Sequence, residues 1–242
     1  PRSLAMSYYA DLDVSIIDEL PPGRSPVRTR LVADGRRAEV IARVHDACME
    51  GRQAYWVCPL IEESETLQLQ TAQETFARLT EELPDLRIGL VHGRLKPAEK
   101  SAVMEAFVRG EIQVLVATTV IEVGVDVANA SLMIIEHAER FGLAQLHQLR
   151  GRVGRGAAQS ACILLYARPL GETARARLKV IFENSDGFEI ARQDLALRGP
   201  GEFIGARQSG LPLLRYANLD EAALVDAAGA VAEVMMRDTP VA

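Results

Sequence analysis

Nearly continuous apolar runs that alternate with helical segments most constrain the fold of this chain. The runs are AYWVCPL (54–60), IQVLVAT (112–118), SLMIIE (131–136) and ACILLY (161–166). Strands that are apolar on both sides are typical of a sheet whose two faces are both covered. The segments between them repeat apolar residues at helical spacing, as in 36–51, where Gly51 ends the pattern. The alternation predicts an α/β fold with a mostly parallel sheet and helices on both faces.

The remaining elements follow from the same patterns. VRTRLV (27–32) predicts an edge strand and RIGLVH (87–92) another strand, while helices are expected over 67–83 and 97–109. Beyond Tyr166 the periodicity becomes helical, over 173–184 and 188–197. A glycine-rich turn over 197–212 and a last amphipathic helix near 219–236 follow. The end of the strand and helix alternation places a domain boundary near Arg168.

Ligands of open α/β sheets gather outside the carboxyl ends of the strands. Three segments with polar or basic residues fall on that edge: His92 and Gly93 after one strand, Thr118 and Thr119 after the next, and the approach to Gln148 after a third. We therefore expect the binding chemistry at this rim.

The segment QLRGRVGR (148–155) holds three arginines and two glycines in eight residues. A guanidinium presents a planar fork of donors that matches phosphate oxygens, and glycine lets the backbone approach a ligand closely. The block predicts a polyphosphate sensor. The alternative is a basic, solvated helix end.

Charge is distributed unevenly. The chain carries a net charge of −6, yet residues 148–215 hold 11 Lys and Arg against 6 Asp and Glu. Any phosphate-binding face is therefore expected in the C-terminal third.

Cofactor and compartment signals are few. The three cysteines have no CxxC spacing, and the four histidines do not cluster with carboxylates, so no metal site is expected. No apolar run approaches the roughly 20 residues of a membrane span, and the N-terminal residues do not resemble a signal peptide. We therefore expect a cytoplasmic chain that is a piece of a larger protein. The phosphate loop GxxxxGK[ST] occurs nowhere, so we expect the chain alone not to hydrolyse ATP.

Two motifs carry a family resemblance. QLRGRVGR resembles the sixth motif of superfamily-2 helicases, and VATTVIEVGVDV (116–127) resembles their fifth. The segments 139–156 and DGFEIARQDLALRGPGEFIGARQSG (186–210) are similar to those of the RecG family of branched-DNA helicases. The resemblance covers about residues 1–214.

The resemblance implies a RecA-like sheet and a division of the chain. Residues 1–26 would be the tail of a missing first motor domain and a linker, 27–167 a second RecA-like helicase domain, and 168–242 a helical hairpin, loop and C-terminal helix coupling to DNA.

The resemblance also implies roles for single residues. Arg152 and Arg155 would contact the γ-phosphate of ATP, with Gln148 supporting the catalytic site, and Gly124 and Asp126 would help to bind the nucleotide. Arg150 would be structural. The residues implied in DNA binding or coupling are Thr118, Thr119, His92, Gly93, Arg94, Arg177, Arg198 and Gln208. From the residues alone, the two threonines also fit a helix N-cap, the 92–94 loop a plain turn, and Arg177 a charge on an exposed helix.

The expected function is therefore that of a fragment of an ATP-dependent helicase acting on branched duplex DNA in repair and recombination. ATP and Mg²⁺ would be bound mainly by the missing first motor domain, and the N-terminal wedge domain would be a further partner. The alternatives are a transcription-repair coupling factor or another superfamily-2 translocase, or a DNA-binding module without turnover.

Overall fold

The computed structural model describes residues 26–59, 65–118, 127–154, 156, 159–198 and 222–238. Contacts divide the chain into two compact units, residues 19–197 and residues 1–18 with 198–242. In the second unit the structure describes α9 (Ala222–Asp238), whose exposed apolar residues include Leu224, Val231, Val234 and Met235. All other elements below belong to the first unit.

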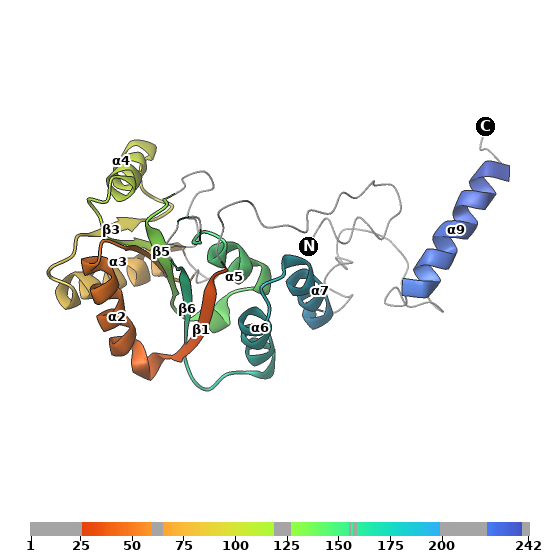
Figure 1. Cartoon of the computed structure of the whole chain (residues 1–242), viewed down its shortest axis with the longest axis horizontal. Coiled ribbons are helices and arrows are strands. Elements are labelled where there is room, and N and C mark those ends of the chain that lie inside the picture. The colour runs from red at the N-terminus through yellow and green to blue at the C-terminus, as the bar shows by residue number, and fades with distance from the viewer. Residues whose placement is uncertain are drawn as a thin grey trace. The chain divides into compact units, whose positions relative to one another are not determined.

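A parallel sheet organises the first unit (Figure 1). It has six strands in the order β1-β6-β5-β2-β4-β3, and every neighbouring pair is parallel. The strands are β1 (Arg28–Ala33), β2 (Gln53–Val57), β3 (Ile88–Val91), β4 (Val114–Ala117), β5 (Ala130–Ile135) and β6 (Ala161–Tyr166). Because all strands run the same way, their carboxyl ends share one edge of the sheet.

Helices cover both faces, and β2 shows how its residues divide between them. Tyr55 and Val57 point into one apolar cluster, whereas Ala54 and Trp56 point into the other, as the alternation of a strand requires. One cluster includes α2 (Arg37–Met49) and α3 (Glu65–Glu82). The opposite cluster includes α4 (Pro97–Val108), α5 (Leu143–Arg150), α6 (Glu172–Glu183) and α7 (Gly187–Arg198).

The sequence prediction of a covered parallel sheet is confirmed, and β1 lies at the edge as expected. The described helix ends differ from the predicted ones by at most three residues. Gly51 follows α2 with φ 88°, a left-handed conformation that suits glycine and ends the helix. Two short 3-10 helices, η1 (Asp34–Arg36) and η2 (Ala138–Arg140), complete the described elements.

Helices α6 and α7 share the core of the sheet. Leu178 and Ile181 of α6 and Ile190 of α7 are each at most 2% exposed and lie in the same cluster as α5. The compact unit accordingly continues to Leu197. The division into domains at residues 26 and 167 stays a prediction.

Candidate functional site

Helix α5 carries the start of the arginine block. The helix begins after Gly142, whose main-chain N–H donates to the side chain of Gln145 at 3.0 Å. Leu143, Leu146 and Leu149 are buried against the sheet. With these leucines on the buried face of the helix, Gln148 is exposed and Arg150, two residues later, is buried.

Arg150 is a structural residue. Its Nη1 donates to the main-chain oxygens of Ile181 and Asn184, both at 2.8 Å, and lies 3.4 Å from Thr29 Oγ1. These carbonyls are at the C-terminal end of α6, where a cation satisfies free acceptors and complements the helix dipole. Burial lowers the pKa of the guanidinium. The structural interpretation of Arg150 therefore agrees with its contacts.

Arg152 has a different environment. It lies in the turn after α5, where its main-chain N–H donates to Leu149 O at 3.0 Å, and it is half-buried. Its side chain makes no hydrogen bond or ion pair with the described part of the chain. Gly154 follows with φ 87°, a turn conformation that glycine adopts without strain. An exposed amide, Gln148, and a guanidinium thus stand at one helix end, and both can donate to phosphate oxygens.

The loops after β3 and β4 lie side by side. The Thr118 N–H donates to Val91 O at 3.3 Å, which brings the end of β4 against the loop of His92, Gly93 and Arg94. Thr118 is buried, whereas Gly93 and Arg94 are exposed. Burial, with Arg94 nearby and against the effect of Glu99, lowers the pKa of His92. His92 is thus held toward its neutral form, and the structure brings these four predicted residues together.

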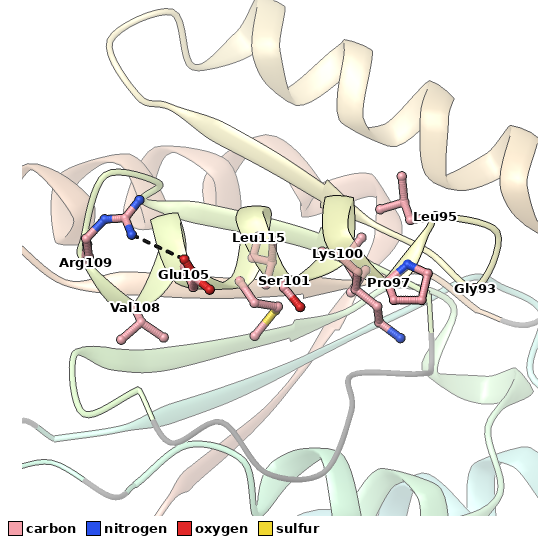
Figure 2. Close-up of a pocket in the computed structure, with 12 residues that line it drawn as sticks. Gly93, Leu95, Pro97, Lys100, Ser101, Glu105, Val108, Arg109 and Leu115 are labelled. Atoms are coloured by element: carbon pink, nitrogen blue, oxygen red, sulfur yellow. Dashed lines mark ion pairs between the residues drawn. The ribbon is translucent and has the colours of Figure 1, made fainter.

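A groove of about 600 Å³ begins beside this loop (Figure 2). Gly93, Pro97 and Lys100 lie at one end, and Arg109 lies at the other, 3.7 Å from Glu105. Its floor is apolar and includes Leu115 and Met104. The basic and acidic side chains at the Arg109 end offset each other, which makes that end a poor anion site.

Arg177 is bound to the backbone rather than free on a helix surface. Its Nη2 donates to Glu139 O at 3.0 Å, which joins α6 to η2. The Glu139 carboxylate in turn lies 3.2 Å from His137 Nδ1 and accepts the Ala167 N–H at 3.3 Å. The segment leading into α5 is thereby attached to α6 and to the end of β6.

A second polar cluster was not anticipated from the sequence. Glu136 directly follows β5 and is 6% exposed. Its carboxylate lies 2.9 Å from Arg37 Nε and 3.5 Å from Arg78 Nη2, and it accepts from Thr75 Oγ1 at 3.3 Å. The Arg37 guanidinium also lies over the Trp56 ring, 5.2 Å from its centroid. The only signal in the sequence was a lone carboxylate directly after a buried strand. Its partners lie far away in the sequence, on helices α2 and α3.

Several predicted residues lie outside the described part of the chain: Thr119, Gly124, Asp126, Arg155 and Gln208. Arg198 ends α7, but its side chain is not described. Within the described residues, no group of three or more His, Cys, Asp or Glu is arranged to hold a metal, and no helix is long and apolar enough to cross a membrane.

Two family models match the chain. Residues 38–157 match the helicase conserved C-terminal domain, and residues 184–242 match domain 3, C-terminal, of the ATP-dependent DNA helicase RecG. The first match covers strands β2 to β5, and the second covers α7 and α9.

Curated relatives agree with these models. The chain is 64% identical over 220 residues to the ATP-dependent DNA helicase RecG of Escherichia coli K12, which covers 90% of the chain and 32% of that protein. It is 59% identical over 241 residues to the protein of the same name from Acidithiobacillus ferridurans, with 99% of the chain and 35% of the relative covered. The chain thus spans about a third of the length of these relatives.

Solved structures give the same relationship. A structure of RecG bound to a three-way DNA junction has 47% identity and a TM-score of 0.72, covering 93% of this chain and 29% of that one. The L327V variant of the S. cerevisiae protein Dbp5, bound to RNA and ADP BeF3, has 17% identity and a TM-score of 0.52 over 75% of this chain and 45% of that one, a likeness of fold alone.

Proposed function

Since the chain belongs to the RecG family of ATP-dependent DNA helicases and matches the C-terminal part of its members, we propose that it supplies the second motor domain and the DNA-coupling segment of a branched-DNA helicase. The observation that carries the proposal is the end of α5. Gln148 is exposed and Arg152 is half-buried there, in a chain that has no phosphate loop of its own. A sensor without a phosphate loop is half of a nucleotide site whose other half belongs to a preceding domain.

The residues at this rim fit the polyphosphate of ATP. Arg152 has no carboxylate partner within the described residues, so its guanidinium is available to phosphate oxygens. Arg152 and Arg155 would hold the γ-phosphate, Gln148 would support them, and Gly124 and Asp126 would contact the rest of the nucleotide. ATP supplies the free energy of its hydrolysis, and the missing first motor domain would hold Mg²⁺ and the other phosphates. Arginines placed in this way stabilise the charge that develops on the transferred phosphoryl group.

The coupling to DNA rests on two further groups. The exposed backbone of Gly93 with Arg94, next to His92 and Thr118, would contact DNA phosphates, and Thr119 would take part in the same contact. Arg177, Arg198 and Gln208 would transmit domain closure to the duplex. The bond from Arg177 to Glu139 O supports this role, because it joins α6 to the segment that leads into α5. Branched DNA is the proposed substrate, and the N-terminal wedge and first motor domains are the proposed partners in the cytoplasm.

ATP hydrolysis by the full-length protein, stimulated by a three-way DNA junction, tests the proposal. Arg155→Ala should lower the stimulated rate by about 10³-fold, in line with the effect of arginine fingers. Arg152→Ala should also lower it. Arg192→Ala, which removes an exposed arginine paired with Glu189, is the control and should keep the wild-type rate. Wild-type turnover in the Arg155→Ala and Arg152→Ala variants would refute the proposed site.

The half-site argument has its own test. The 242-residue chain on its own should hydrolyse no ATP above background, with or without junction DNA. Hydrolysis by the isolated chain that is lost on Arg155→Ala would contradict the argument. In the full-length protein, Arg198→Ala should reduce fork unwinding more than ATP hydrolysis, and an equal loss of both would contradict the coupling role.

A further inference from the structure

A second groove lies at the opposite edge of the sheet from the β3 loop. It has a volume of about 890 Å³ and is formed by β1, the end of β6, the loop that follows it, and α6. From α6 it takes Arg175, Leu178, Lys179 and Phe182. These positions are three, four and seven residues apart, so they form one stripe along the helix. We call this feature the β1–α6 groove.

The charge of the β1–α6 groove is of one sign. Arg168, Arg175 and Lys179 line it, and no acidic residue of the described part of the chain does. Lys179 lies 4.0 Å from Glu183, and both side chains are exposed, so this pair is weak. Arg168 and Arg175 make no ion pair with the described part of the chain. In a chain of net charge −6, three cations with so little compensation favour an anionic ligand.

The groove also contains aromatic surface. Phe182 is 46% exposed, whereas Leu178, one turn earlier on the same stripe of α6, is only 2% exposed. Tyr166, at the end of β6, is half-buried in the same groove. Phe182 thus leaves nearly half of its surface in solvent beside the cations of the groove. Cations that follow a phosphate backbone, with an aromatic ring on which a base can stack, are how proteins bind single strands.

We propose that the β1–α6 groove binds a single strand of nucleic acid, with phosphates at Arg168, Arg175 and Lys179 and a base on the ring of Phe182. A single strand fits better than a duplex because the faces of paired bases are covered by their neighbours, whereas unpaired bases are free to stack. The site goes beyond the proposed function, whose DNA contacts lie elsewhere. It requires neither ATP nor the arginine block.

The proposal is tested by the fluorescence anisotropy of a labelled twelve-residue oligo(dT), titrated with the full-length protein without ATP at several salt concentrations. The double variant Arg168→Ala, Arg175→Ala should weaken binding and reduce the slope of log K against log salt by about 1.4, since each single-strand phosphate contact contributes about 0.7. Phe182→Ala should weaken binding about tenfold and leave the salt slope unchanged, because stacking releases no counterions.

Matched controls exist in the chain. Phe188 on α7 is 49% exposed and lies outside the groove, so Phe188→Ala removes a comparable ring. Arg87, an exposed residue just before β3, provides the charge control Arg87→Ala. Both controls should bind oligo(dT) as the wild type does. Thermal melting should show that all variants are folded, because the substituted arginines are exposed and each phenylalanine leaves nearly half of its surface in solvent.

Three results would overturn the proposal: groove variants that bind like the wild type, controls that lose as much affinity as the groove variants, or a polyglutamate peptide that displaces oligo(dT) as well as unlabelled oligo(dT) does. The last result would indicate a general anion surface. A failure of the motor proposal would be separate, since it would appear as absent junction-stimulated ATP hydrolysis while groove-dependent binding of oligo(dT) remained.

Discussion

The guanidinium of Arg150 lies 2.8 Å from the main-chain oxygen of Asn184, the C-cap residue of α6. With a second bond to Ile181 O, this contact attaches the arginine block of α5 to the helix that follows the last strand. Two arginines separated by one glycine are thereby given different environments. Arg150 stabilises the packing of α5 on α6, whereas Arg152, our proposed phosphate contact, makes no such bond with the described residues.

Replacing Arg150 should reduce stability. Arg150→Met leaves the carbonyls of Ile181 and Asn184 without their donor, and we expect the free energy of unfolding to fall by about 2 kcal/mol. Urea denaturation measures this change. Arg152→Ala, which removes a half-buried side chain without a described partner, should change it by less than about 0.5 kcal/mol. Equal effects of the two substitutions would contradict the assignment.

The Glu136 cluster predicts a larger loss. Glu136→Gln removes the negative charge that Arg37 and Arg78 share, and the Arg37 side chain is only 12% exposed. Removing one partner of a buried ion pair costs about 3 kcal/mol. Glu39→Gln, in an exposed pair with Arg36, is the control and should leave the free energy of unfolding nearly unchanged. If both variants unfold at the wild-type urea concentration, the cluster contributes nothing to stability.

Gly156, just past the arginine block, should not tolerate a side chain. A Cβ at this position would clash with the main-chain oxygen of Ala128, which cannot move as a flexible side chain does. We expect Gly156→Ala to lower the melting temperature by several degrees, as a loss of about 2 kcal/mol would. At Gly93 nothing lies within 4 Å of the added Cβ, so Gly93→Ala should melt like the wild type. A wild-type melting temperature for Gly156→Ala would show that the contact with Ala128 relaxes freely.

His137 should titrate above the usual range for histidine. The hydrogen bond that the His137 ring donates to the Glu139 carboxylate raises the pKa of His137, although burial opposes it. A histidine whose pKa is raised on folding stabilises the fold fully below its unfolded pKa of about 6.5, and this contribution is lost as the pH rises through the folded pKa. NMR titration of the ring should show the raised pKa, and Glu139→Gln should lower it. An unchanged pKa in Glu139→Gln would exclude the pair as its cause.

The main features of the fold follow from local patterns. The apolar runs 54–60, 112–118, 131–136 and 161–166 coincide with strands β2, β4, β5 and β6 of one parallel sheet, whose residues are apolar on both sides. Gly51 and Pro97 mark helix ends through their own backbone preferences. The shared carboxyl edge of parallel strands also brings Thr118 to the His92 loop.

The tertiary structure alone decided what each charged side chain does. Arg150 and Arg152 have the same chemistry, and only the carbonyls at the end of α6, more than 30 residues downstream, give Arg150 its structural contacts. Glu136 and Arg37 are 99 residues apart and meet because α2 packs on the sheet that contains β5. Apolar periodicity reports which face of an element is buried, but the partner of a polar group depends on which distant segments fold against it.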